Sequence, residues 1–162
     1  LGYDFPRVLA LDVRDCVYVE VENPLPKPLA LPTLWVPNIL LSCDYLISVA
    51  PFKVVDSWVS FSISNLLGLL PPRKYAEEGK FLEELGLDNV IADLYFTFPF
   101  DLGVIDARTG LFQGPGGEGQ ARDFGKIFSG EPFAVDQEAA EFSGLEVGYL
   151  QLIASAKATF AA

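Results

Sequence analysis

The sequence predicts an α/β fold in which a mixed sheet of about five or six strands is flanked by helices. Short apolar runs of strand length recur between residues 7 and 129. Three segments in the second half instead carry apolar residues at helical spacing, each beside a capping or breaking residue. Apolar residues make up 51% of the 162-residue chain, enough for one substantial core, so we expect a single domain over 1–162.

Residues 1–42 are expected to form a strand hairpin followed by a proline-rich connector. The hairpin strands are 7–13 and 16–22, and the second of them alternates in the period of a half-buried strand. Five prolines between residues 23 and 37 exclude a helix and a central strand there. This leaves an extended connector with a short edge strand at 29–31, followed by one helical turn at 38–43.

Further strands are expected in the region 43–150. Residues 44–50 form a compact apolar run closed by Pro51, and 101–107 form a second such run, both typical of buried strands. A short strand is expected at 126–129.

Helices are expected between and after these strands. Residues 57–70 favour a helix with Ser57 at its N-cap, although serines at alternate positions in its first half also permit a strand. Asp88 is the expected N-cap of a later helix. The remaining helices are expected at 80–85, 89–96, 133–142 and 146–157.

Charge and composition exclude several classes of function. The chain carries 22 Asp+Glu against 11 Lys+Arg, a formal net charge of −11, which argues against nucleic-acid partners and anionic membrane surfaces. No run approaches the roughly 20 continuous apolar residues of a membrane span. Because the chain has no His, the Ser-His-Asp and Cys-His mechanisms and all histidine metal sites are excluded.

The cysteine content favours a cytoplasmic protein. Cys16 and Cys43 are too few for a disulfide framework or, alone, for a zinc site. Both lie in or beside apolar runs, so buried free thiols are expected, although one bridge between them stays open. The sequence contains no Met, and we therefore expect a chain that was trimmed or belongs to something longer.

Candidate ligand-binding residues follow the expected strands. Lys53 lies just past the strand 44–50, at the carboxyl end where open α/β sheets bind ligands. Asn65 is unusual inside a helix, which indicates close packing or a ligand. The loop after residue 107 is rich in glycine, which lets a backbone approach a ligand closely, but it matches neither nucleotide-binding fingerprint. The glycines that we expect to bind a ligand are Gly114, Gly116 and Gly117.

Two acids are the candidate metal ligands. Asp106 ends the expected strand 101–107, and Asp136 falls in the first turns of the helix 133–142. Together with Asn65 and loop carbonyls they would give an all-oxygen shell suited to Mg²⁺ or Ca²⁺. The alternative for Asp136 is a favourable interaction with the helix dipole, worth roughly 0.3–1 kcal/mol.

Six short motifs occur in an order that resembles one known family. They are Ala-Pro-Phe-Lys-Val-Val at 50–55, Ile-Ser-Asn-Leu-Leu-Gly at 63–68, Ala-Asp-Leu at 92–94, Val-Ile-Asp-Ala at 104–107, the Gly-Pro loop at 112–119 and Glu-Pro-Phe-Ala-Val-Asp at 131–136. The series is similar to the bacterial and archaeal family known as domain of unknown function 362 (DUF362), over about 43–150. Val54-Val55 replaces the family's Thr-His, and Ser64 replaces its Lys.

The resemblance implies a link to redox chemistry, because members of that family often carry a ferredoxin-type iron–sulfur segment. Two cysteines cannot hold a four-iron cluster, so no such cluster is expected in this chain. Two functions stay open. One is the binding of a divalent metal or small anionic ligand at the strand ends. The other is a non-catalytic partner or accessory domain of an iron–sulfur redox system, as a homodimer or bound to a redox protein. An enzyme that uses Lys53 as base or nucleophile is a third reading.

Overall fold

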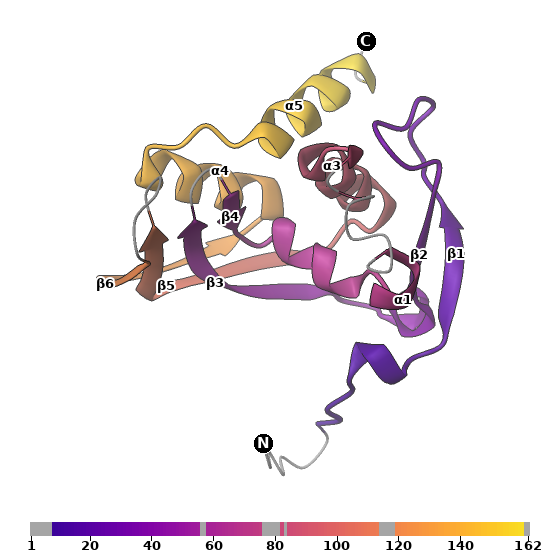
Figure 1. Cartoon of the computed structure of the whole chain (residues 1–162), viewed down its shortest axis with the longest axis horizontal. Helices are drawn as coiled ribbons and strands as arrows, with labels where there is room; N and C mark the ends of the chain where they lie inside the picture. Colours follow the sequence, from indigo (N-terminus) through magenta and orange to yellow (C-terminus); the bar gives the residue numbers. More distant parts are fainter. Residues whose placement is uncertain (1–7, 56–57, 76–81, 83, 114–118, 161–162) are drawn as a thin grey trace.

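The computed structural model describes residues 8–55, 58–75, 82, 84–113 and 119–160. It confirms the α/β class: a four-stranded mixed sheet carries helices on one face, and a separate two-stranded ribbon lies beside it (Figure 1). The large sheet has the order β4-β3-β5-β6, and the ribbon pairs β1 with β2. The strands are β1 (Tyr18–Glu22), β2 (Thr33–Pro37), β3 (Ile47–Val55), β4 (Trp58–Ser60), β5 (Leu102–Gln113) and β6 (Gln120–Gly130).

The helices fall between and after the strands. The α-helices are α1 (Pro72–Tyr75), α3 (Leu87–Thr97), α4 (Pro132–Ser143) and α5 (Gly148–Phe160), and the 3₁₀ helices are η1 (Val13–Asp15), η2 (Asn38–Ser42) and η3 (Ser64–Leu69). None of the helices in the described ranges has the length and apolar character needed to cross a bilayer.

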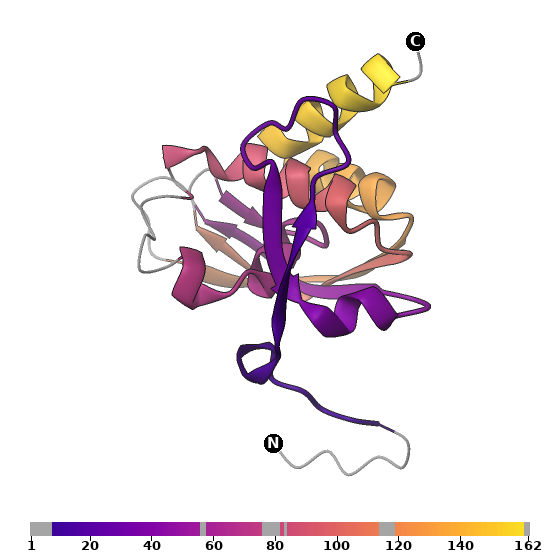
Figure 2. The same cartoon turned by 90° about the vertical axis from the view of Figure 1, so that its right-hand side faces the viewer.

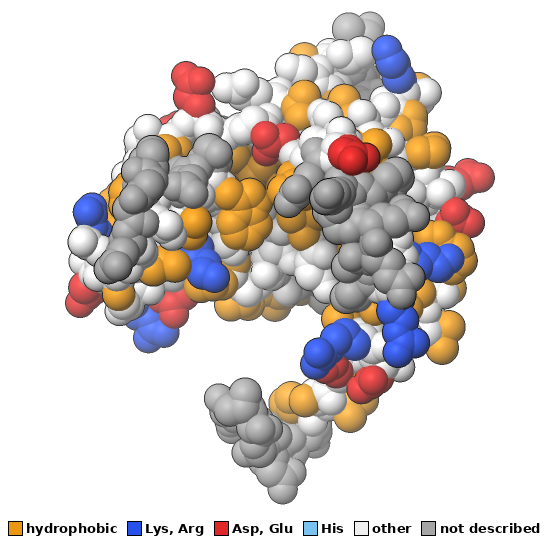
Figure 3. All heavy atoms as spheres, viewed as in Figure 1, with side chains coloured by type: hydrophobic (Ala, Val, Ile, Leu, Met, Phe, Trp, Pro, Cys, Tyr) orange, Lys and Arg blue, Asp and Glu red, His pale blue; other side chains and the backbone are white. Residues whose placement is uncertain are grey.

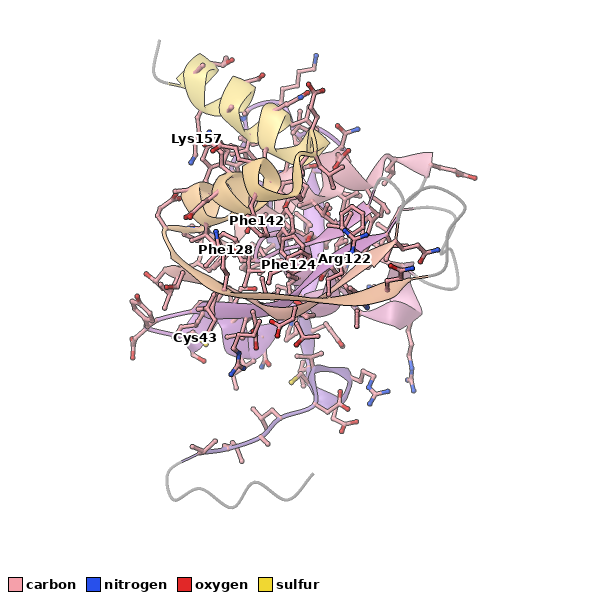
Figure 4. The ribbon with its side chains drawn as sticks, turned by 90° about the vertical axis from the view of Figure 1, so that its left-hand side faces the viewer. Cys43, Arg122, Phe124, Phe128, Phe142 and Lys157 are labelled. Carbon is pink, nitrogen blue, oxygen red and sulfur yellow. The ribbon has the colours of Figure 1, made fainter. Side chains whose placement is uncertain are left out.

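The strand register assigns side chains to the two faces of the large sheet. Ala50 of β3 lies beside Ile105 of β5, which lies beside Phe128 of β6. These three side chains are at most 4% exposed. They belong to the side of the sheet on which α4 packs against β5 and β6 (Figure 4). Successive strand residues point to opposite faces, so the next row along the strands belongs to the other face.

The second face of the sheet, here called the open face, has no helix over it in the described structure (Figure 1). It carries Pro51, Asp106 and Ile127, which are aligned across β3, β5 and β6. Ile127 is 55% exposed, and Ile47 and Val49 on β3 are 48% and 62% exposed.

Phenylalanine side chains fill the space between the sheet and α4. The Phe142 ring of α4 lies 5.5 Å from the rings of Phe124 and Phe128 of β6, measured between centroids (Figure 4). The Phe52 ring of β3 lies 5.4 Å from that of Phe124. A Cβ atom at Gly110 would come within 2.8 Å of Phe52, so glycine is needed where β5 passes under this cluster.

A buried carboxylate on α3 holds the ribbon to the rest of the molecule. Asp93 is fully buried and accepts hydrogen bonds from the backbone N–H groups of Leu29 (3.0 Å), Ala30 (2.7 Å) and Leu31 (2.8 Å). The proline-rich connector therefore has its donors satisfied by one acid rather than by a strand partner. The ribbon runs across one side of the molecule, with the connector at the level of α3 and α5 (Figure 2).

The strand expected at 7–13 is wrong for residues 8–13. β1 pairs with β2 instead, so the expected hairpin partner is replaced by a segment further along the chain. Val8, Leu9 and Leu11 are 51–78% exposed, and Asp12 caps the tight turn η1 by accepting the Arg14 N–H. The edge strand expected at 29–31 lies at Thr33–Pro37.

The helix expected at 57–70 is wrong in its first half, where the alternative strand is confirmed. β4 pairs with Lys53–Val55, and η3 follows it. Ser57 lies outside the described residues, as do residues 80, 81 and 83 of the helix expected at 80–85. Gly86, not Asp88, is the N-cap of α3. The Asp88 carboxylate instead accepts the Tyr149 N–H at the start of α5.

The other expected elements are confirmed with shifted boundaries. β3 continues through Pro51 because β4 pairs only with Lys53–Val55, which leaves one side of β3 without a strand neighbour at the proline. α4 ends at Gly144 in the left-handed conformation, with φ of 70°.

Both cysteines are free, but Cys43 is exposed and Cys16 is partly exposed, so the expected burial is wrong.

β6 forms one edge of the sheet and is interrupted in its middle. Gly125 has φ of 62°, and its N–H donates to the Asp123 carboxylate at 3.0 Å. The register between β5 and β6 shifts at this point, as in a β-bulge.

We expect Asp93→Ala to lower the free energy of unfolding by about 3 kcal/mol or more, because three N–H groups, one buried and two partly buried, lose a charged acceptor. Urea denaturation measures the change. Asp123→Ala removes an exposed carboxylate that accepts a single bond from Gly125, so a loss of about 1 kcal/mol or less is expected for this control. Equal losses in the two variants would contradict the role given to Asp93.

Candidate functional site

A buried carboxylate lies where α4 meets η3 and α5. Asp136 is fully buried. One of its oxygens accepts from the Ser62 N–H at 2.9 Å and from the Ser62 hydroxyl at 2.5 Å. The other accepts from the Ile63 N–H at 3.0 Å and the Tyr149 hydroxyl at 2.7 Å. Both oxygens are therefore engaged by donors of the protein.

Local sequence explains why these groups meet. The Glu131 side chain caps α4 by accepting the Ala134 N–H at 2.8 Å, and Pro132 occupies the first helical position. This places Asp136 in the second turn, above the strand β5. A Cβ atom at Gly103 of β5 would lie 2.5 Å from the Ser62 hydroxyl, so glycine lets the strand pass directly beneath this turn.

Burial dominates the electrostatics of the cluster. It raises the pKa of Asp136 to about 6, against the lowering effect of the hydrogen bonds from Ser62, Ile63 and Tyr149. The pKa of the Tyr149 hydroxyl is raised well above its ordinary value, first by burial and then by the charge of Asp136. The cluster links α4 to the turn before η3 and to α5 through hydrogen bonds. Its geometry therefore serves to hold these three elements together.

Asp106 lies on the open face and is paired with Arg108. The Arg108 side chain donates through Nε to Oδ1 at 3.0 Å and through Nη2 to Oδ2 at 2.7 Å. These bonds lower the pKa of Asp106 to about 2. Asp136 lies on the helix-covered side, next to Gly103, so the structure does not bring the two expected metal ligands together.

The other expected site residues are also separated. Lys53 is exposed on the open face near the carboxyl end of β3, in register with Leu111 of β5. The Asn65 side chain donates to the Ser48 hydroxyl at 3.1 Å and to the Val49 carbonyl at 3.4 Å, along the side of β3 that lacks a strand neighbour. The exposed Asn65 side chain thus has hydrogen-bond partners on β3. Gly114, Gly116 and Gly117 lie outside the described residues.

The described part of the chain offers little to a divalent cation. It contains no group of three or more His, Cys, Asp or Glu placed to hold a metal ion. Arg108 occupies both oxygens of Asp106, and four donors occupy those of Asp136.

Two partners in these clusters were missed from the sequence. Asp93 stands in the Ala-Asp-Leu motif, and an acid on the apolar side of a helix is a signal of a buried carboxylate. Tyr149 carries no comparable signal, because a tyrosine in an amphipathic helix is an ordinary core residue.

Comparison with known proteins gives one family. The profile of a family described as "Domain of unknown function (DUF362)" matches residues 5–141. Neither the curated proteins nor the solved structures include a significant match to this chain.

We expect Asp136 to make the protein less stable as the pH rises. Its pKa increases from an ordinary 3.8 to about 6 on folding, so the folded state keeps a proton that the unfolded chain releases between these values. This contribution to stability is fully present below pH 3.8 and is lost as the pH rises through about 6. The loss amounts to about 3 kcal/mol.

Urea unfolding of wild type and Asp136→Asn across this pH range isolates the effect as the difference between the two proteins. Tyr149→Phe removes one bond that lowers the pKa of Asp136, so its transition should move to higher pH. A wild-type minus Asp136→Asn difference that does not change with pH would contradict the assignment.

Proposed function

The chain belongs to the DUF362 family, a domain of unknown function, and from that premise we propose that it is a non-catalytic interaction domain that pairs with a second copy through the open face of its sheet. The observation that carries this proposal is the exposure of Ile47, Val49 and Ile127 on one face of the sheet, each about half exposed or more. Groups of exposed apolar side chains on one face can mark protein interaction surfaces.

The charges on the open face support a second copy as the occupant. The chain as a whole carries a formal net charge of −11, which opposes association over most of its surface. On the open face, however, the two bases Lys53 and Arg108 are balanced by the two acids Asp106 and Asp123. This region is therefore free of the acidic excess that would repel an identical chain.

The pairing of Asp106 and Arg108 also suits a two-fold interface. In such an interface the same patch is used by both subunits, so it must be complementary to itself. An exposed acid and an exposed base two residues apart meet that condition, because the Arg108 guanidinium of one copy can bind the Asp106 carboxylate of the other. The exposed apolar side chains of β3 and β6, on either side of this pair, would be buried in the interface.

An accessory role toward an iron–sulfur protein, expected from the family resemblance, would use the same face with a different occupant. We also propose a reducing, cytoplasmic setting for the protein. The two free cysteines, one of them exposed, support this location.

Ligand binding at the strand ends is the second candidate function. The exposed ammonium of Lys53 at the end of β3 favours a small anionic ligand over a metal ion. A divalent cation has less support, because the two expected carboxylates lie on opposite faces and are already hydrogen-bonded.

Light scattering of the protein as it elutes from a size-exclusion column gives its molar mass and so tests self-association. We expect wild type to form a dimer at tens of micromolar, and Val49→Lys or Ile127→Lys to raise its Kd by about tenfold or more, since each places a charge in an apolar contact. Val17→Lys is the matched control, because Val17 is 68% exposed but lies outside the large sheet.

Circular dichroism would confirm that each variant is folded. A wild-type protein that stays monomeric at high concentration would overturn the proposed pairing. A monomer that binds an iron–sulfur protein through Val49 and Ile127 would assign the face to the accessory role instead.

We expect chelator-stripped protein to show a Tm shift of less than about 1 °C on addition of Mg²⁺, Mn²⁺ or Ca²⁺. A site filled at a hundredfold excess over Kd would add about 2.7 kcal/mol, equivalent to several degrees. A shift that disappears in Asp106→Asn but persists in Asp123→Asn would restore the metal site at the strand ends.

A further inference from the structure

A second surface feature lies away from the open face, where η1, the ribbon and α1 meet. The hollow there, called the ribbon pocket, is lined by Asp12, Arg14, Tyr18, Trp35, Arg73 and Lys74 among others, and has a volume of about 810 Å³. Pockets that bind small organic molecules have volumes of roughly 300–1,000 Å³.

The ribbon pocket is basic in a strongly acidic chain. Three of the 11 Lys+Arg residues line it, together with the two acids Asp12 and Asp15. Figure 3 shows basic side chains gathered between α1 and the N-terminal segment. Within the described ranges, Arg73 and Lys74 form no ion pair. The ion pairs there join Arg14 to Asp12 and Arg108 to Asp106.

The walls of the ribbon pocket are tied together by hydrogen bonds. The Tyr18 hydroxyl donates to the Val13 carbonyl at 2.8 Å, which fixes η1 against β1. The backbone N–H of Trp35 donates to the Tyr75 hydroxyl at 3.0 Å, which fixes β2 against α1. The basic groups are therefore carried by elements that are already in place before any ligand arrives.

The side chains inside the pocket are also oriented. The Lys74 ammonium lies 3.0 Å from the centroid of the Trp35 ring, as a cation–π pair. Asp12 holds the Arg14 guanidinium through Nε at 3.0 Å and Nη2 at 2.6 Å. Because Asp12 uses only one edge of the guanidinium, Arg14 retains N–H donors for a second anion.

We propose that the ribbon pocket binds a small organic phosphate. Guanidinium and ammonium groups together suit the tetrahedral, multiply charged phosphate, which accepts several charge-assisted hydrogen bonds at once. The aromatic rings of Trp35 and Tyr18 give the pocket an apolar wall for the organic part of the ligand. This site is separate from the open face, so it does not depend on self-association.

The tryptophan content makes a direct test possible. The chain has two tryptophans, so in Trp58→Phe protein the fluorescence comes from Trp35 alone. Phenyl phosphate is the probe, with inorganic phosphate, benzoate and phenol as comparisons. We expect a saturable change in Trp35 emission with phenyl phosphate, and weaker binding of the other three.

Calorimetry on the full chain then assigns the residues. Arg73→Gln and Lys74→Gln should each raise the Kd for phenyl phosphate by about tenfold or more. Lys157→Gln is the matched control, because the Lys157 ammonium also lies over an aromatic ring, 4.4 Å from the centroid of Phe133, but on α5 (Figure 4). Val49→Lys should bind the probe as wild type does, whatever its oligomeric state.

Three results would overturn the proposal. The first is the lack of any saturable signal with phenyl phosphate at millimolar concentration. The second is equal weakening in Lys157→Gln, which would show a general charge effect. The third is tighter binding of benzoate than of phenyl phosphate, which would assign the pocket to carboxylates.

Discussion

The structure depends on the burial of one carboxylate, Asp136. Its four hydrogen bonds reach a turn 73–74 residues earlier in the chain and a helix 13 residues later. Removing this acid from water is unfavourable, which is why its pKa rises, but the buried donors of Ser62, Ile63 and Tyr149 need an acceptor. The carboxylate thus decides how α4, η3 and α5 sit on the sheet. Asp93 holds the ribbon in the same way.

The two faces of the large sheet differ in how completely their apolar side chains are covered. On the helix-covered side the core is closed, and no buried side-chain nitrogen or oxygen in the described residues lacks a hydrogen-bond partner. The open face is built from the alternate residues of the same strands, so its apolar character is fixed by the same sequence. The exposed apolar side chains there do not contribute to the closed core. The features that point to function therefore lie outside the core.

Much of the fold could be predicted from local sequence, because apolar periodicity and capping residues are local signals. The positions of β3, β5, α3, α4 and α5 follow from them, as does the end of α4 at Gly144. The segment 8–13 has the apolar content of a strand but forms none, since β1 takes β2 as its partner instead. Strand pairing is a tertiary property that a single segment does not encode.

The candidate site was harder to predict for the same reason. Alternation along β5 already places Asp106 on the side opposite Ile105, so its separation from a helix-covered acid could have been inferred. The partners of Asp136 could not, because Ser62 and Tyr149 meet it only after the helices have docked. The basic residues of the ribbon pocket are likewise brought together from distant segments, 14 and 73–74.

The kink at Gly125 affects how readily β6 can pair with strands of other molecules. An unpaired outer strand normally offers a regular row of N–H and C=O groups on which further chains can add, and fibril growth proceeds in this way. In β6 that row is broken near its middle, where the backbone turns left-handed and Asp123 takes the Gly125 N–H. A newly arriving strand would lose its register after a few residues. The kink therefore disfavours the addition of further strands, and so fibril growth, along this edge.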